Sequence, residues 1–83
     1  MRKTLIYYKP EYLELAKKIQ ENYAEHRHEA DVVSEEEQDD VEYARKMHYD
    51  EAIFIEDEGT VIIHDVKTWH TERLSVSDIL YAD

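Results

Sequence analysis

Apolar positions are densest in residues 51–66, where two short apolar runs flank a turn. Residues 52–55 form an unbroken apolar run, the pattern expected of a strand that is covered on both faces. Gly59, the one glycine of the chain, follows three acidic residues, and residues 61–66 form a second segment rich in β-branched side chains. Two such runs around a short glycine-containing turn predict a β-hairpin.

The chain before this hairpin predicts a strand, a helix and a second strand. Residues 4–8 are β-branched and aromatic, which favours a strand. Pro10 suits the first turn of a helix, where its missing N–H has no intrahelical partner to lose. Apolar residues then recur at helical spacing, so we expect this helix to run to about residue 25. Residues 30–33 predict the second strand.

Two further helices are predicted from capping signals. Ser34 and Glu37 have the spacing of a capping box, so we expect Ser34 to be the N-cap of a second helix that runs to about residue 48. After the hairpin, residues 71–76 predict a fifth strand. Ser77 is the predicted N-cap of a short last helix, flanked by the apolar pair Val76 and Tyr81.

The predicted order is β-α-β-α-β-β-β-α, and we expect residues 1–83 to form a single domain of the α/β class. Right-handed crossovers make the first three strands parallel and place the first two helices outside the sheet. The last two strands extend the sheet antiparallel. The prediction is a mixed five-stranded sheet of order 2-1-3-4-5 with three helices, in two or three layers.

Composition limits the possible functions. A chain of 83 residues buries about 60–65% of its unfolded surface, which leaves little interior for a catalytic cavity. The absence of cysteine removes disulfides, thiolate nucleophiles and Cys-based zinc sites. The longest apolar runs have four residues, far below the roughly 20 needed to span a bilayer. We expect a cytoplasmic protein that makes no membrane contact.

The formal net charge of −11 is concentrated in one segment. Residues 34–58 carry eleven acids against Arg45 and Lys46, a net of −9. Such a segment repels phosphate backbones, so direct nucleic-acid binding is not expected. The segment is interpreted either as a solvated face that aids solubility or as a surface for a basic protein partner.

Several acids of the second predicted helix are candidates for a partner contact. In that helix Asp39 and Asp40 would each lie four residues after another acid, a like-charge spacing that destabilises helices. Acids that oppose helix stability are expected where they serve a contact. The candidate interaction residues are Glu35, Glu36, Asp39, Asp40, Glu42 and, from the turn before the fifth strand, Trp69.

Trp69 is a candidate because a large aromatic residue in a turn either packs back onto the domain or meets a partner. Tyr7 and Tyr8 alternate in the first strand, so one of them should face outward. The histidines lack the spacing of a metal site, and the carboxylates and serines suggest no catalytic pair. With a single glycine there is no phosphate-binding loop. We therefore expect no enzyme activity, no cofactor and no metal.

The order of elements and several core segments resemble the C-terminal anticodon-binding domain of class II aminoacyl-tRNA synthetases, of the histidyl-tRNA synthetase type. This type also occurs in the synthetase-like regulatory subunit of ATP phosphoribosyltransferase. The resemblance rests on residues 12–16, 41–46, 52–55 and 61–68. It implies an anticodon-binding-like fold and a non-catalytic accessory role.

This sequence departs from the family at glycine positions. The family usually has glycine before the second strand, after the second helix and after the third strand, where this chain has polar residues near His28, then Tyr49, then Glu56-Asp57. A turn that commonly ends in Thr-Gly is Thr68-Trp69 here. The acidic segment also opposes tRNA binding, which favours the regulatory-subunit branch.

Two interpretations follow. The first is a non-catalytic regulatory domain of the histidyl-tRNA-synthetase-like family, with a role in histidine biosynthesis and a subunit interface. The second is a small acidic inhibitor, of phage or mobile-element type, that presents a nucleic-acid-mimicking face to a basic partner. Either an excised domain or a complete protein, and either a monomer or a homo-oligomer, fits these residues.

Overall fold

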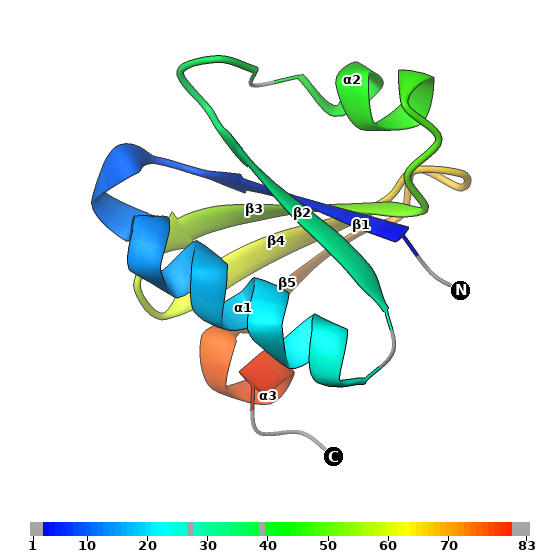
Figure 1. Cartoon of the computed structure of the whole chain (residues 1–83). Coiled ribbons are helices and arrows are strands. Elements are labelled where there is room, and N and C mark those ends of the chain that lie inside the picture. Colours follow the sequence, from blue (N-terminus) through cyan, green and yellow to red (C-terminus); the bar gives the residue numbers. More distant parts are fainter. Residues whose placement is uncertain (1–2, 27, 39, 81–83) are drawn as a thin grey trace.

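A five-stranded mixed sheet forms the middle layer of the molecule, and helices lie on both of its faces (Figure 1). The structure is a computed structural model that describes residues 3–26, 28–38 and 40–80. The elements are, in chain order, β1 (Lys3–Tyr8), the 3-10 helix η1 (Pro10–Tyr12), α1 (Leu13–Glu25), β2 (Glu29–Ser34), α2 (Val41–Lys46), β3 (Glu51–Asp57), β4 (Thr60–Asp65), β5 (Thr71–Ser75) and α3 (Val76–Leu80). Because α1 and α3 cover one face and α2 lies on the other, the fold has three layers.

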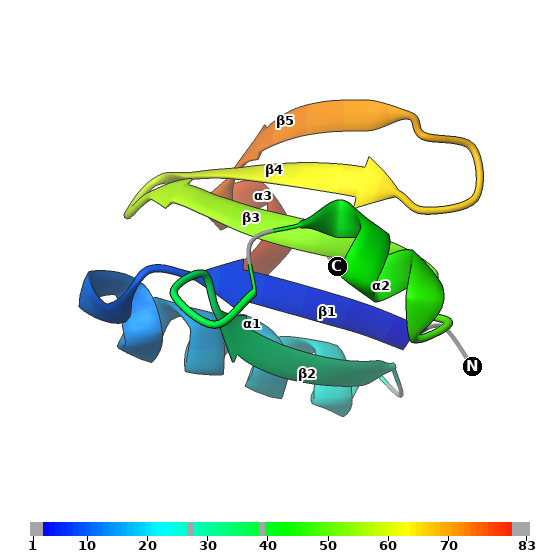
Figure 2. The ribbon, with the colours of Figure 1, turned by 90° about the horizontal axis from the view of Figure 1, so that it is seen from above.

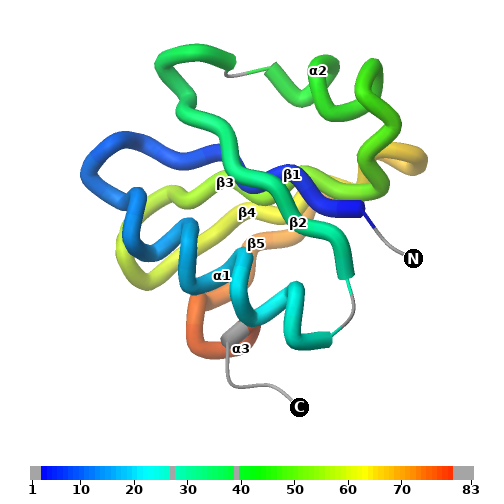
Figure 3. The backbone as a smooth tube through the Cα atoms, viewed as in Figure 1, coloured from blue at the N-terminus to red at the C-terminus, as the bar shows by residue number. Residues whose placement is uncertain are grey.

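The strands lie in the order β2-β1-β3-β4-β5. β1 is parallel to both of its neighbours, whereas β4 is antiparallel to β3 and to β5. The path of the chain can be followed in Figure 3, where β1 runs between β2 and β3. The predicted α/β class, the strand order 2-1-3-4-5 and the strand directions are confirmed.

The larger part of the core lies between the sheet and α1. Ile6, Ile53 and Val61 point to this face and are fully buried, together with Ala16 and Ile19 of α1. The helix faces the sheet because its apolar residues recur every three or four positions. Within the described residues no helix is long and apolar enough to cross a membrane.

The opposite face is covered by α2 and is rich in aromatic side chains. Leu5, Tyr7 and Ala52 are buried there against Ala44 of α2. The ring of Tyr7 stacks on that of Phe54, with centroids 4.2 Å apart. In Figure 2, α2 lies over β1 and β3, while β4 and β5 lie beside it.

The expectation that Tyr7 or Tyr8 faces outward is wrong. Tyr7 is fully buried on the α2 face, and Tyr8 is half-buried against the cluster on the α1 face. Alternation does send the two side chains to opposite faces. Both are covered because β1 is the central parallel strand, with helices above and below it.

The expected second helix, from Ser34 to about residue 48, is much shorter. It spans Val41–Lys46, and residues 35–37 form a turn after β2. Strand pairing persists to Glu35, whose N–H donates to the carbonyl of Tyr8 at 2.8 Å. Residues 35–40 contain no apolar side chain, so a helix there could bury no face against the sheet.

The predicted cap of the last helix is also wrong by two residues. α3 begins at Val76, and the N–H of Asp78 donates to Oγ of Ser75 at 3.3 Å. Ser75 therefore takes the capping place that was expected for Ser77. Val76 is buried in the core below the sheet. Tyr81, the other member of the expected apolar pair, lies outside the described residues.

Candidate functional site

The acidic turn after β2 contains Glu35 and Glu36, two of the predicted interaction residues. Oγ of Ser34 accepts a hydrogen bond from the N–H of Glu36 at 3.2 Å, and the carbonyl of Ser34 accepts from the N–H groups of Glu37 and Gln38, both at 3.0 Å. The side chains of Glu36 and Glu37 are exposed, and that of Glu35 is half-buried. Ser34 therefore closes a turn, and these acids do not form the first turn of a helix.

Asp40 is the N-cap of α2. Its backbone is extended, and Oδ1 accepts a hydrogen bond from the N–H of Glu42 at 2.9 Å. This satisfies one of the amide groups that a helix leaves unpaired at its start. Asp40 was expected to oppose the helix through its spacing from Glu36, and that expectation is wrong because residue 36 precedes the helix. Asp39 lies outside the described residues.

Glu42, Arg45 and Trp69 form a chain of contacts along one side of α2. The carboxylate of Glu42 and the guanidinium of Arg45 are 3.7 Å apart, and both side chains are about 60% exposed. The guanidinium carbon of Arg45 lies 5.7 Å from the centre of the Trp69 ring, which comes from the loop between β4 and β5. An exposed ion pair of this kind contributes little stability, about 0–1 kcal/mol.

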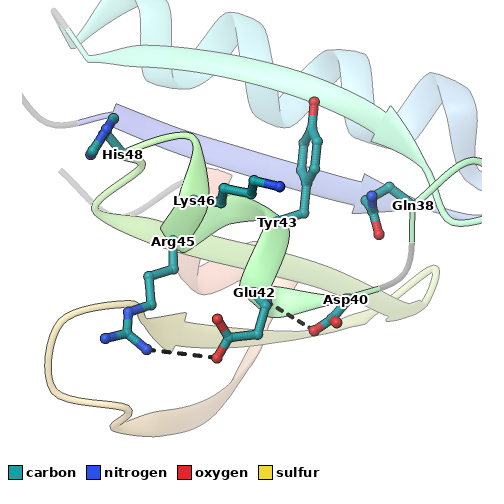
Figure 4. A pocket seen from close by; sticks show the side chains of 7 residues that line it. All are labelled: Gln38, Asp40, Glu42, Tyr43, Arg45, Lys46 and His48. Atoms are coloured by element: carbon teal, nitrogen blue, oxygen red, sulfur yellow. Dashed lines mark hydrogen bonds and ion pairs between the residues drawn. The ribbon is translucent and has the colours of Figure 1, made fainter.

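Figure 4 shows how the side chains of α2 are divided. Glu42 and Arg45 lie on the side toward β4 and β5, whereas Tyr43 and Lys46 lie on the side toward β2. An open groove of about 490 Å³ follows this outer surface. Its lining residues are Gln38, Asp40, Glu42, Tyr43, Arg45, Lys46 and His48. The side chains that line the groove carry charges of both signs.

A second hollow, of about 470 Å³, lies where the end of α2 meets the loop between β4 and β5. Arg45, His48, Lys67 and Trp69 are among its lining residues. The ammonium of Lys67 is 3.3 Å from Oδ1 of Asp50, which also lines the hollow. We call this hollow the loop cavity. Of the predicted interaction residues that the structure describes, Trp69 alone lines it.

The loop cavity is bordered by two residues with unusual backbone angles. His48 has φ 64° and Trp69 has φ 62°. At His48 the cause is the end of α2, where the N–H of Tyr49 donates to the carbonyl of Ala44 and the N–H of His48 to that of Arg45. This is a Schellman ending, whose left-handed position is usually glycine. A side chain in this conformation costs roughly 1–2 kcal/mol.

Three acidic segments converge at the carboxyl ends of the parallel strands. Each segment follows one of these strands: residues 11–14 follow β1, residues 35–37 follow β2 and residues 56–58 close β3. A shallow hollow whose charged lining residues are Glu11, Glu14, Lys18 and Glu58 shows that the first and third segments adjoin. We call this surface the acidic end. It consists of Glu11, Glu14, Glu35, Glu36, Glu37, Glu56, Asp57 and Glu58.

Charge counting along the sequence missed Glu11 and Glu14, because they lie in a segment with no net charge. The signal that could have found them is topological. Segments that follow neighbouring parallel strands begin at the same end of the sheet, where the carboxyl ends of those strands lie. One acid of the set is paired, since Nε of Arg73 donates to Oε2 of Glu56 at 2.9 Å.

The pKa values of Tyr49 and His64 are shifted from their usual values. Burial and the hydrogen bond that the Tyr49 hydroxyl donates to Asp31 at 2.8 Å raise the pKa of that hydroxyl. Burial lowers the pKa of His64, whose Nδ1 lies 3.0 Å from Oγ1 of Thr71. Neither group joins a metal cluster: the described residues contain no group of three or more His, Asp or Glu placed to hold an ion.

Comparison with known proteins gives a structural likeness. Histidyl-tRNA synthetase from Nostoc sp. PCC 7120 matches with a TM-score of 0.79 and 10% sequence identity. The match covers 95% of this chain and 20% of the synthetase chain, so the chain spans about a fifth of that protein. No family model and no curated protein matches the sequence. Together with the strand order, the likeness shows that this chain has an anticodon-binding-like α/β fold of the histidyl-tRNA synthetase type.

Proposed function

We propose that the chain is a non-catalytic accessory or regulatory domain that acts through protein–protein contacts, with its acidic end as the contact surface for a basic partner. The observation that carries this proposal is the convergence of three acidic segments, distant in sequence, at one end of the sheet. The fold supports the accessory role, because it is found as one part of a much longer synthetase chain.

The acidic end is better explained by a contact than by solubility. Acids scattered over the surface would keep the domain soluble with less mutual repulsion. Most of these side chains are exposed, and the turn that carries Glu36 and Glu37 is held by Ser34 and not by the glutamates. A clustered field of one sign speeds encounter with a partner of the opposite sign and fixes its orientation.

Within the synthetase-like family, the charge favours the regulatory-subunit branch over a tRNA-binding domain. A tRNA-binding surface gains most of its affinity from basic side chains that release counterions from phosphate. The acidic end has the opposite sign. A regulatory subunit of the ATP phosphoribosyltransferase kind, acting in histidine biosynthesis in the cytoplasm, needs a subunit interface and no RNA contact.

The test is recovery of the partner by a tagged chain, followed by native mass spectrometry of the complex. The variant Glu36→Lys/Glu37→Lys/Glu58→Lys reverses the acidic end. The matched control Glu21→Lys/Glu25→Lys/Glu72→Lys makes the same change in net charge at exposed positions outside it. We expect the first variant to lose the partner and the control to retain it. Equal loss in both would reduce the effect to net charge and contradict the proposal.

A second candidate function shares the same surface. A stand-alone inhibitor would use the acidic end in place of nucleic acid on a basic protein, and the density of carboxylates there favours this alternative. The two candidates differ in what competes with the chain. A short DNA or RNA duplex should displace an inhibitor from its partner. A subunit interface should not be displaced by the duplex, and the partner recovered with it should be a protein of the histidine pathway.

A further inference from the structure

The two non-glycine residues with positive φ among the described residues border the same cavity. Both His48 and Trp69 line the loop cavity, although 21 positions separate them in the sequence. They belong to different elements, the end of α2 and the loop between β4 and β5. Residues with a strained backbone conformation cluster at functional sites, where their side chains take part in binding or catalysis.

Neither side chain is needed to build its turn. The ending of α2 is made by backbone hydrogen bonds, which glycine at position 48 would form with less strain. The loop at Trp69 is held by Oδ1 of Asp65, which accepts from the N–H groups of Lys67 and Thr68, and by the N–H of Trp69 donating to the carbonyl of Asp65. A bulky residue at φ 62° is an outlier that glycine would remove.

The loop cavity presents the aromatic ring of Trp69 beside the cationic side chains of Arg45 and Lys67. Trp69 is 46% exposed, and the Arg45 guanidinium, which also pairs with Glu42, lies 5.7 Å from its ring centre. The Lys67 side chain is 77% exposed at the same cavity. Asp50 lines the cavity too, but its carboxylate already accepts the N–H of Lys3 at 2.9 Å and pairs with Lys67.

We propose that the loop cavity binds a small organic anion that combines a flat aromatic ring with one carboxylate or phosphate group. The ring stacks on Trp69, and the anionic group pairs with Arg45 and Lys67. Aromatic faces favour stacked flat partners, and guanidinium groups hold carboxylate or phosphate through paired N–H donors. This inference does not rest on the proposed function, because it uses no residue of the acidic end.

The overall negative charge does not prevent such binding. The loop cavity lies at the start of β3 and the acidic end at its finish, and seven residues of strand span roughly 20 Å at about 3.3 Å per residue. Charges at that separation are largely screened at physiological salt, where the Debye length is about 8 Å. Local groups therefore determine the potential that a small ligand meets: Arg45 and Lys67, together with the carboxylates of Glu42 and Asp50 that pair with them and that an anionic ligand would have to replace.

Trp69 supplies its own readout, because it is the one tryptophan of the chain. The experiment titrates the full chain with benzoate and with phenyl phosphate while following tryptophan emission. Cyclohexanecarboxylate lacks the aromatic ring, benzamide lacks the charge and inorganic phosphate lacks the ring. We expect a saturable change with benzoate or phenyl phosphate that the three controls do not produce. A linear change with all five probes, or none with any, would overturn the proposal.

Variants separate binding from folding. Arg45→Gln and Lys67→Gln should each lower the affinity for the probe about tenfold, the loss expected for one charge-assisted contact. Lys46→Gln is the matched control, since it removes a neighbouring exposed charge that does not line the loop cavity. If Lys46→Gln weakens the probe as much as Arg45→Gln does, general charge attraction explains the binding and the site is disproved.

His48→Gly tests the meaning of the backbone strain. Relief of the positive φ should raise the melting temperature by roughly 4–8 °C for a domain of this size. The same variant removes a side chain that lines the loop cavity, so it should also weaken binding of the probe, as measured from the emission of Trp69. A lower melting temperature would show that His48 stabilises the fold, and the argument from strain to a ligand site would then fail.

Discussion

The hydroxyl of Tyr7 donates a hydrogen bond to the backbone carbonyl of Asp40 at 2.6 Å, across 33 positions of sequence. Tyr7 belongs to β1, the central one of the three parallel strands, and Asp40 is the N-cap of α2, so this bond attaches the start of the short helix to the sheet. A helix of six residues has little stability of its own. Its position depends on such tertiary contacts.

Tyr7→Phe should therefore destabilise the domain without changing its fold. The ring still stacks on Phe54, but the Asp40 carbonyl loses the hydroxyl donor, while the N–H of Tyr43 still donates to it at 3.1 Å. We expect the free energy of unfolding to fall by about 1 kcal/mol, the usual net value of one hydrogen bond. Urea denaturation followed by circular dichroism measures it. An unchanged midpoint would mean that the bond contributes nothing.

Asp40→Ala should cost about 1 kcal/mol of stability, as is typical for loss of an N-cap. Asp40→Asn is the matched control, because asparagine caps helices about as well as aspartate does. Ser34→Ala removes a bond within an exposed turn and should cost less than Asp40→Ala. Chemical denaturation of the three variants tests this order. A larger loss for Ser34→Ala than for Asp40→Ala would restore the capping role first expected of Ser34.

His64 should make stability depend on pH in a defined direction. Burial lowers its pKa in the folded state, so the unfolded chain binds this proton more readily. The contribution of neutral His64 is complete above its unfolded pKa of about 6.5 and is lost as the pH falls through and below that value. Melting temperatures from pH 8 down to about pH 5 should fall more for the wild type than for His64→Gln.

The exposed His70 provides the control for that measurement. His70→Gln should follow the wild-type pH profile, because it leaves His64 in place. Protonation of the many carboxylates relieves repulsion at low pH and acts on all three proteins. The difference between variants is therefore the quantity to compare. Identical profiles for the wild type and His64→Gln would contradict the assigned role of burial.

Transfer RNA should not bind the chain measurably at physiological salt. The acidic end and the net charge of −9 over residues 34–58 oppose the counterion release that drives such binding. A gel-shift experiment with labelled transfer RNA at micromolar protein tests this. A shift that weakens with added salt would contradict the prediction and return the chain to the tRNA-binding branch of the family.

The sequence by itself determined the sheet and its topology. Apolar runs of strand length, one helix with a clear 3.6-residue period and a glycine-containing turn are local signals, and each is strong enough to place its element. Right-handed crossover connections then allow the order 2-1-3 for the three parallel strands, with one helix on each face of the sheet. The strand order 2-1-3-4-5 and the concentration of acids after Ser34 could therefore be read without coordinates.

Only the tertiary structure decided where α2 begins and what its residues meet. Ser34 and Asp40 are both good capping residues, and the choice between them depends on how far β2 pairs with β1 and on which apolar residues reach the sheet. The contact of Arg45 with Trp69, and the hollow that Glu11 and Glu14 line together with Glu58, join segments distant in sequence. No local pattern encodes such contacts, because they arise when separate elements pack on one sheet.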